Sequence, residues 1–315
     1  MITQCSSLHI IGIVLFSNLW YSIIMVLEYK IKENDNYITL KDLLKNHFQI
    51  SDRLLIKLKH EQKIFVNNTK AYVDMSLNLG DIVYVYVDFI EDNSNIVPNN
   101  MPLDIVYEDD AFLVVNKPSG VPVHPSMEHF EDSLSNAIKY YFDTIGLKKK
   151  IRPVNRLDKD TSGLVIFAKN EYIQECLVRQ MKTKEFIKEY MAICNGTFEN
   201  LSGTINAPIT RKENSIIERC ISEVGIPAIT HYEVIKNYNN YSVVKCILET
   251  GKTHQIRVHM AYIGHPLLGD TLYGFPSPLI KRQALHAYKI AFIHPITKQK
   301  LEFTAKIPAD FENLI

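Results

Sequence analysis

The segment RPVNRLDKDTSGLVIFA, residues 152–168, joins a charged loop directly to an apolar strand. The loop holds two arginines, two aspartates and a lysine, and the run LVIFA is typical of a buried strand. Loops that a rigid element holds often carry binding and catalytic groups, and a carboxylate beside a cation can act there as a nucleophile. An ordinary charged turn with internal ion pairs is the alternative, and this segment alone does not decide between the two.

The residues around this segment combine helical and strand-like patterns. Apolar stripes at helical spacing predict helices near residues 134–141 and 173–181, and Gly146 is expected to end the first. Runs of β-branched, aromatic and other apolar residues predict strands at 112–115, 164–168, 187–193, 241–248 and 301–305. Because helices and strands do not alternate strictly, an α+β fold is favoured over a doubly wound parallel sheet.

Residues 37–88 predict a small separate unit. Apolar residues follow Thr39, a favourable N-cap, at helical spacing, and a second helix is expected to start near Ser51. The run DIVYVYV, residues 81–87, predicts a strand. The chain therefore divides into an apolar extension (1–27), a small α/β module (28–92), a polar linker (93–102) and a larger domain (103–315).

The apolar run at residues 8–27 is nearly long enough to span a bilayer. No charged residue precedes Glu28, and no small-residue cleavage pattern follows, so a secretory signal is not indicated. The expected explanation is a start-site artefact, with Met25 as the real start. A membrane anchor is the alternative.

Composition excludes several classes of protein. The 315 residues are 46% hydrophobic and 22% charged, and 35 basic residues balance 35 acidic ones, which argues against disorder and against a polytopic membrane protein. Five scattered cysteines without a CxxC pair indicate a reducing compartment, so a cytoplasmic location is expected. GxGxxG, Walker, HExxH and GxSxG motifs are missing, which argues against nucleotide cofactors and serine hydrolysis.

Four further segments accompany residues 152–168 and, together with them, carry a resemblance. The segment 152–168 resembles the signature loop of the RluA/RluD family of RNA pseudouridine synthases. The other family motifs occur in the family's order along the chain. One precedes this segment, NKPSGVPVHP (116–125), and three come after it, KEYMAICNG (188–196), GKTHQIRVHMAYIGHPLLGDTLYG (251–274) and LHAYKIAFIHP (285–295). The match covers roughly residues 103–310 and implies a pseudouridine synthase fold with a central mixed, largely antiparallel sheet. Residues 28–92 resemble an S4 RNA-binding domain.

The resemblance also implies the site residues. Asp158 falls on the family's catalytic aspartate, with Tyr190 and Arg257 on its tyrosine and arginine. Arg156 is expected to fill the gap left by a flipped base. Strand alternation puts Lys188 on the same face as Tyr190. The expected RNA-binding set is completed by the cations Lys188, Arg53, Lys57 and Lys59.

Two positions depart from the family pattern. Asn155 stands where histidine is most frequent, and asparagine cannot change its protonation near neutral pH. Lys252 stands where arginine is frequent, so a bidentate contact would be lost. Histidines 254, 259 and 265 are poorly spaced for a helical metal site, and we expect neither a metal nor a cofactor.

The resemblance implies an enzyme that isomerises specific uridines in RNA to pseudouridine through base flipping. Large-subunit ribosomal RNA is the favoured substrate, transfer RNA stays open, and the expected oligomeric state is a monomer. Attack at C1′, attack at the base and a glycal intermediate are all compatible with Asp158. The alternatives are a non-catalytic S4-type RNA-binding or ribosome-assembly factor and, more distantly, a glycosidase-like hydrolase that pairs Asp158 with Asp160.

Overall fold

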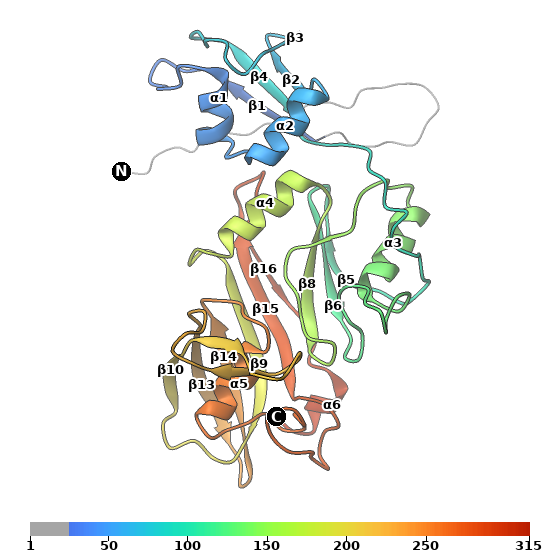
Figure 1. Ribbon diagram of the computed structural model, residues 1–315, viewed down its shortest axis with the longest axis vertical. Helices are drawn as coiled ribbons and strands as arrows, with labels where there is room; N and C mark the ends of the chain where they lie inside the picture. Colours follow the sequence, from blue (N-terminus) through green and yellow to red (C-terminus); the bar gives the residue numbers. More distant parts are fainter. Residues whose placement is uncertain (1–24) are drawn as a thin grey trace.

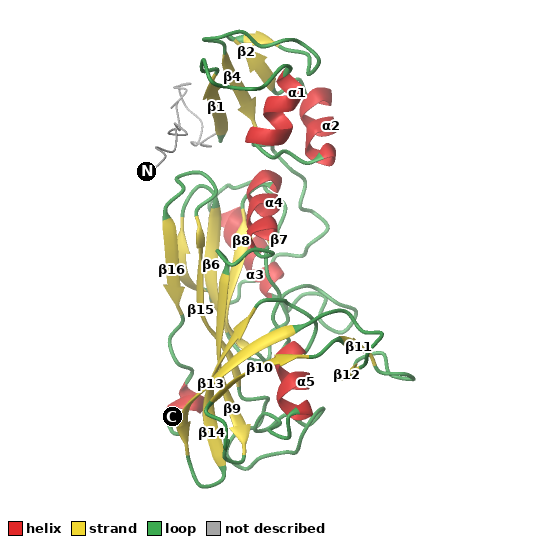
Figure 2. Cartoon of the chain, turned by 90° about the vertical axis from the view of Figure 1, so that its left-hand side faces the viewer, coloured by secondary structure: helices red, strands yellow, loops and turns green. Residues whose placement is uncertain are grey.

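The structure, a computed structural model, describes residues 25–315, which form a small N-terminal unit stacked on one end of a larger domain (Figures 1 and 2). Residues 1–24 lie outside this description, so the predicted start at Met25 and the alternative of a membrane anchor stay predictions. Among the described helices, none has the length and apolar character needed to cross a membrane.

The N-terminal unit places two short helical segments beside a four-stranded sheet of order β1-β4-β2-β3 (Figure 2). Thr39 and Asp42 form a reciprocal capping box, and the Ser51 hydroxyl accepts the Leu54 N–H at 3.1 Å, so both expected helix starts are confirmed. The elements are β1 Val26–Lys30, α1 Leu40–Asp42 with its continuation η1 Leu43–His47, α2 Asp52–His60, β2 Ile64–Val66, β3 Thr69–Lys70 and β4 Ile82–Tyr86.

Strand β1 extends this unit beyond the boundary expected at residue 28. It begins at Val26, which pairs antiparallel with Tyr86 of β4, and the side chain of Leu27 is fully buried. The last residues of the apolar run 8–27 therefore form part of the inner face of the small sheet. Their hydrophobicity has a packing explanation that composition alone does not reveal.

A ten-stranded mixed sheet forms the larger domain. Its main order is β10-β13-β14-β9-β15-β8-β6-β5, β16 pairs with β15, and β7 pairs with β8. β8 and β15 run parallel and the other neighbours run antiparallel, so the expected α+β class with a largely antiparallel sheet is confirmed. The strands are β5 Asp104–Glu108, β6 Phe112–Lys117, β7 Arg152–Pro153, β8 Ser162–Ala168, β9 Ile187–Asn195, β10 Ser202–Asn206, β13 Ile229–Asn237, β14 Tyr241–Leu248, β15 Leu285–Ile293 and β16 Lys300–Thr304.

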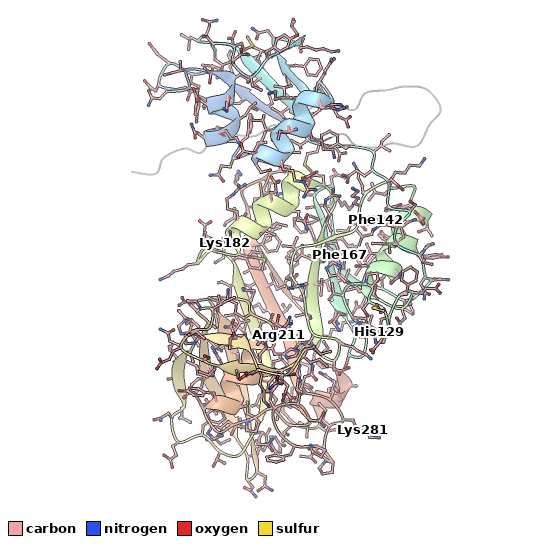
Figure 3. All side chains as sticks on the ribbon, in the orientation of Figure 1. His129, Phe142, Phe167, Lys182, Arg211 and Lys281 are labelled. Carbon is pink, nitrogen blue, oxygen red and sulfur yellow. The ribbon has the colours of Figure 1, made fainter. Side chains whose placement is uncertain are left out.

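Helices cover parts of this sheet, and a two-stranded hairpin projects beside one of them (Figure 2). Helix α3 ends before Gly146, whose φ of 69° suits a glycine C-cap, as expected. Phe142 of α3 and Phe167 of β8 belong to one buried cluster (Figure 3). The elements are α3 Leu134–Thr144, α4 Glu171–Gln180, α5 Gln255–Tyr262, α6 Ala309–Glu312, and the hairpin strands β11 Ile209–Arg211 and β12 Arg219–Ile221.

Gly163 lets β8 approach β15 closely at the centre of the sheet. Its φ is +113°, and a Cβ atom there would lie 2.3 Å from the carbonyl oxygen of Ala287 on β15. Glycine is therefore required both by the backbone conformation and by the close contact. The contact holds the end of the 152–161 loop, where β8 begins, against β15 in the middle of the sheet.

Ion pairs join the N-terminal unit to the larger domain. The guanidinium of Arg152, the first arginine of the charged loop, binds both carboxylate oxygens of Glu91 at 2.5 and 2.7 Å. Lys149 pairs with Asp88 and donates to the carbonyl of Phe89. Arg152 thus helps to fix the junction between the two units.

Candidate active site

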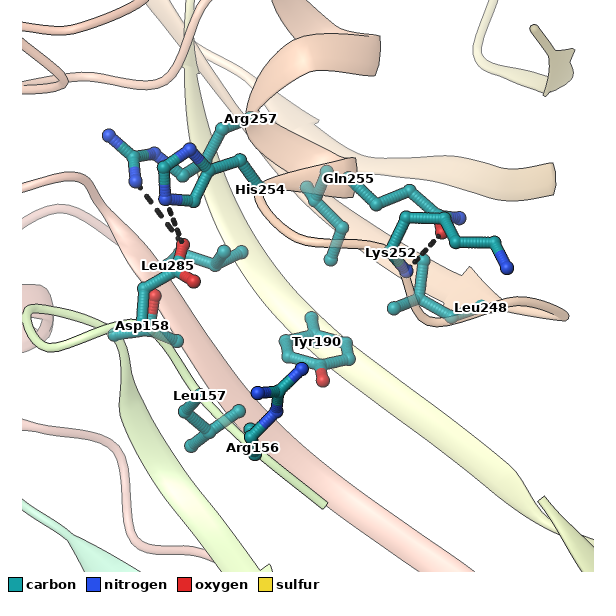
Figure 4. Close-up of a pocket in the computed structure, with 12 residues that line it drawn as sticks. Arg156, Leu157, Asp158, Tyr190, Leu248, Lys252, His254, Gln255, Arg257 and Leu285 are labelled. Carbon is teal, nitrogen blue, oxygen red and sulfur yellow. Dashed lines mark hydrogen bonds and ion pairs between the residues drawn. The ribbon is translucent and has the colours of Figure 1, made fainter. Parts of the chain in front are cut away.

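Asp158 lies at one end of an acid–base–acid series that is centred on Arg257. The Arg257 guanidinium reaches Asp158 Oδ2 through Nη1 at 3.2 Å and binds Asp270 through Nε at 2.7 Å and Nη2 at 2.9 Å (Figure 4). Burial lowers the pKa of Arg257, but the hydrogen bonds and charge of Asp270, with the charge of Asp158, raise it above its ordinary value. The series holds one permanent cation against the Asp158 carboxylate, whose side chain is 25% exposed.

Asp158 and Arg257 line a small hollow with apolar and polar walls (Figure 4). Its volume is about 60 Å³, whereas an engineered cavity that binds an aromatic ring measures about 150 Å³. A base can therefore fit only if rim side chains move, and the exposed Arg156 stands at that rim. The lining residues are Arg156, Leu157, Asp158, Thr161, Tyr190, Leu248, Lys252, His254, Gln255, Ile256, Arg257 and Leu285.

Tyr190 forms a wall of the hollow from β9. It is 8% exposed, and its side chain is part of the hollow's lining. Burial, together with the negative charge of Asp158, raises the pKa of Tyr190 well above its ordinary value, so the phenol stays protonated near neutral pH. Its β9 neighbours on the same face, Ala192 and Cys194, are buried in the same apolar cluster, so that face is apolar rather than polar beyond Tyr190.

The backbone that follows Asp158 is held from two sides. The buried ammonium of Lys117 donates to the carbonyls of Lys159, Pro118 and Val121 at 2.7 to 2.9 Å. On the other side, Arg282 donates to the carbonyl of Asp160 at 3.1 Å. Because these contacts satisfy the loop carbonyls, the Asp158 side chain is presented from a fixed backbone.

Asn155 fixes the opposite end of the same loop. Its side-chain amide donates to the Leu164 carbonyl at 3.0 Å and accepts the Ile166 N–H at 2.9 Å. It is 6% exposed and is absent from the hollow's lining. Two hydrogen bonds of opposite polarity require a donor and an acceptor on one side chain, which asparagine supplies without any proton transfer.

The expected RNA-binding cations occupy different environments. Arg53 pairs with Glu171 at 3.1 Å across the junction between the two units, and Lys57 pairs with Glu91 at 3.3 Å within the N-terminal unit. Lys59 is exposed and has no ion-pair partner in the described part of the chain. The expected RNA contacts of Arg53, Lys57, Lys59 and Lys188 stay predictions.

Lys188 is buried beside the site, not exposed on a surface. It is 5% exposed, and burial, with the nearby cation of Lys252, lowers its pKa to about 8. A lysine with this pKa is protonated in most molecules at neutral pH but loses its charge more readily than an exposed one. Lys188 therefore adds positive charge close to Tyr190, two residues away on β9.

Asp270, Lys117, Arg282 and His254 were not assigned to the site from the sequence. The sequence marks His254 only as a poorly spaced candidate metal ligand, yet its Nε2 lies 3.8 Å from Asp158 Oδ2. The sequence signal was the motif at residues 251–274, which contains both His254 and Asp270. Within residues 25–315, no group of three or more His, Cys, Asp or Glu side chains could hold a metal ion.

The buried imidazole of His286 is expected to make the free energy of unfolding depend on pH. It packs against Ser162 at the start of β8, and burial, followed by the cation of Arg282, lowers its pKa to about 4. An unfolded histidine titrates near pH 6.5, so between these values only the unfolded chain binds the proton, and the free energy of unfolding falls as the pH falls. The shift corresponds to about 3 kcal/mol.

The substitution His286→Gln should therefore flatten this dependence. We expect urea unfolding of the variant to lose less stability between pH 7 and 4.5 than the unaltered protein loses. The exposed His60, replaced by Gln, is the matched control and should leave the pH profile unchanged. Equal profiles for the unaltered protein and the His286 variant would contradict a buried neutral imidazole.

Comparisons with known proteins agree with one another. Residues 111–262 match the family model described as RNA pseudouridylate synthase. The uncharacterized RNA pseudouridine synthase YhcT of Bacillus subtilis (strain 168) is 39% identical over 290 residues, 91% of this chain and 96% of that protein. The ribosomal large subunit pseudouridine synthase D of Pasteurella multocida is 39% identical over 250 residues, 75% of this chain and 76% of that protein.

The fold also resembles solved structures. The structure titled human RNA pseudouridylate synthase domain containing 1 matches with a TM-score of 0.55 at 28% identity, covering 67% of this chain and 85% of that one. Human RNA pseudouridylate synthase domain containing 4 matches with a TM-score of 0.53 at 22% identity, covering 66% and 89%. The second likeness concerns the fold alone.

Proposed function

This chain belongs to the RNA pseudouridylate synthase family and is an enzyme that acts on RNA, and we propose that it isomerises specific uridines in large-subunit ribosomal RNA with Asp158 as its catalytic group. The observation that carries the proposal is the position of Asp158. It is a partly exposed carboxylate at the hollow, paired with a cation that a second, buried carboxylate orients.

Pseudouridine formation suits these residues. The N1–C1′ bond of uridine breaks, the base turns, C5 bonds to C1′, and the proton lost from C5 is balanced by one gained at N1. Atoms and electrons balance without an oxidant, a reductant or a phosphate donor, and we propose that no nucleotide cofactor is used. Asp158 acts at C1′, at the base or through a glycal, and Arg257 holds its carboxylate in place by a charge-assisted hydrogen bond.

Base flipping assigns roles to the residues around Asp158. The target base must leave its stack before a side chain can reach it, and the aromatic ring of Tyr190 offers it a stacking surface. The raised pKa of Tyr190 argues against a phenolate that removes the C5 proton in the free enzyme. Arg156, at the rim, is suited to occupy the space that the base leaves, because its guanidinium is planar.

The N-terminal unit offers an RNA path at its junction with the larger domain, consistent with the proposed S4 role. A cleft of about 1050 Å³ runs from β2 and β4 to the end of α3. Lys63 and Lys148 lie along it, and the rings of Phe65 and Tyr86 pack edge to face with their centroids 5.4 Å apart. Cations beside aromatic rings are suited to single-stranded nucleic acid, because phosphates and base faces are recognised together.

The double substitution Lys63→Ala and Lys148→Ala tests this path, because both lysines line the cleft. Each lost phosphate contact should lower the slope of log Kd against log salt by about 1, so we expect a decrease of about 2 and weaker binding at low salt. Lys300→Ala is the matched control, because this exposed lysine of β16 is not among the residues that line the cleft and should leave the slope unchanged. Filter binding over a salt series measures the RNA affinity and its salt slope. An unaltered slope in the double variant would contradict the proposed RNA path.

Mapping of pseudouridine in RNA tests the activity and the target together. Unmodified ribosomal RNA, ribosomal subunits and transfer RNA would be incubated with the protein or with its Asp158→Ala variant. Carbodiimide labelling and primer extension are needed because uridine and pseudouridine have the same mass. A stop in large-subunit RNA with the unaltered protein alone is expected. A stop only in transfer RNA would overturn the proposed target, and binding without any stop would favour a non-catalytic binding factor.

The remaining parts of the proposal concern the state of the enzyme. A ribosomal RNA substrate implies that it works in the cytoplasm. We further propose that it acts as a monomer, because the residues assigned to the reaction all come from one chain. Light scattering of the purified protein, with and without RNA, measures the oligomeric state directly.

A further inference from the structure

His254 sits in an unusual backbone conformation immediately before helix α5. Its φ of 59° and ψ of 17° are left-handed, a region that favours glycine and costs a histidine energy. Its side chain is 12% exposed, and its Nε2 lies 3.8 Å from Asp158 Oδ2. The backbone is thus strained at the residue whose imidazole points toward the proposed catalytic carboxylate (Figure 4).

The other side of the imidazole is held by Tyr273. His254 Nδ1 lies 2.8 Å from the Tyr273 hydroxyl oxygen, and the backbone N–H of Arg219 donates to that same oxygen at 2.8 Å. The ring of Tyr273 also packs against Arg257, whose Cζ is 5.1 Å from the ring centroid. Tyr273 therefore contacts both residues that flank Asp158.

The polarity of these bonds selects one form of His254. A backbone N–H can only donate, so the Tyr273 oxygen accepts from Arg219. Among residues 25–315, the one acceptor recorded for the hydroxyl proton of Tyr273 is His254 Nδ1, so that proton points toward His254. Nδ1 of a neutral imidazole must then accept, and the ring proton resides on Nε2. The resulting Nε2–H faces Asp158. Burial lowers the pKa of His254, which keeps the ring neutral near pH 7.

We propose that His254 is a positioning residue for Asp158, and that Tyr273 together with the Arg219 backbone fixes its Nε2–H tautomer for that task. This inference rests on the proposed function and deepens it. The 3.8 Å separation is longer than a hydrogen bond, and such contacts often tighten only when substrate is bound. His254 then offers Asp158 Oδ2 a neutral donor beside the Arg257 cation, so that the carboxylate keeps one orientation while the base moves.

The charges around His254 come from several elements. Asp158 and Asp270 favour its protonation, whereas Arg257 of α5 and Arg219 of β12 oppose it. Arg219 lies in the hairpin that projects from the domain (Figure 2). Because the Arg219 amide is the first donor in the series, a shift of this hairpin would change the hydrogen bonds that reach Asp158.

Kinetics of three variants separate positioning from packing. We expect His254→Ala to lower the single-turnover rate by about 10- to 100-fold, because a small misplacement of a reacting group has effects of this size, with RNA Kd nearly unchanged. His254→Gln can place its side-chain amide near Nε2, and we expect it to restore most of the rate. Both variants share the backbone cost of the left-handed position. Tyr273→Phe, which removes the proton donor, should lower the rate as well.

Nitrogen NMR of the imidazole gives a readout that does not need activity. In histidine-labelled protein, long-range proton–nitrogen correlations should show His254 protonated at Nε2, and Tyr273→Phe should weaken that preference. A wild-type ring protonated at Nδ1, or a His254→Ala rate equal to that of the unaltered protein, would overturn the inference. Absence of pseudouridine with the unaltered protein would instead contradict the proposed function, and the tautomer would still be measured.

Discussion

The substitution Asp158→Asn is expected to lower the rate of pseudouridine formation by about 10⁴-fold or more, the size seen when a nucleophile is removed. Asparagine keeps the shape of the side chain and an oxygen that can accept from Arg257. It lacks the negative charge and the nucleophilic oxygen, so the chemical step is lost while the fold stays. RNA affinity should change by less than about threefold, because phosphate contacts dominate it. Single-turnover assays and filter binding measure the two quantities.

Asp160→Asn is the matched control for this experiment. Asp160 lies two residues away, and its backbone carbonyl, not its side chain, accepts from Ser119 and Arg282. We expect the rate to stay within about fivefold, since surface substitutions away from specific contacts have small effects. Comparable losses in both variants would instead point to a carboxylate pair, as in a glycosidase-like hydrolase. Full activity of the Asp158 variant would show that Asp158 is not the catalytic group.

Local signals in the sequence predicted the elements that local physics controls. The N-caps at Thr39 and Ser51 and the stop at Gly146 are confirmed, because each depends on residues within one turn. The family predicted from the ordered motifs is confirmed by the comparisons. The strand pairing was beyond this reasoning, since β8 and β15 are joined by contacts between residues 162–163 and 286–287. Pairs so distant leave no periodic signal in either segment.

The site was predicted only in part, because contacts between distant segments leave no local signal in the sequence. The resemblance placed Asp158, Tyr190 and Arg257 in one site, and the structure brings all three to the same hollow. Their catalytic roles stay proposals. The supporting groups were missed because a buried lysine or arginine looks like a surface one in a sequence. Lys117 is fully buried, and only the fold shows that its Nζ lies within hydrogen-bond distance of three carbonyl oxygens.

The largest effect on stability is expected from Asp270→Asn. The Asp270 side chain is fully buried and binds Arg257 through two oxygens, and its Oδ1 also accepts the N–H groups of Leu272 and Tyr273 at 3.0 and 3.2 Å. Removal of one partner from a buried ion pair costs about 3 to 5 kcal/mol, and Arg257 would keep only its single, longer contact with Asp158. We expect that loss in the free energy of unfolding, measured by urea titration.

Asp310→Asn provides a control of the same geometry and different burial. Asp310 binds Arg282 through two oxygens at 2.7 and 3.0 Å, but its side chain is 41% exposed. Solvent can replace a lost partner there, so the expected cost is about 1 kcal/mol or less. Equal losses in the two variants would show that burial does not determine the strength of these pairs.

The two aspartates that hold Arg257 should therefore separate activity from stability. Asp158→Asn removes the partly exposed partner of Arg257. We expect activity to be lost, with a free energy of unfolding close to that of the unaltered protein. Asp270→Asn removes the buried partner, and we expect both quantities to fall, because Arg257 loses the contacts that orient it toward Asp158. If Asp270→Asn lowered stability but left the single-turnover rate unchanged, Arg257 would not need that orientation, and its proposed role beside Asp158 would fail.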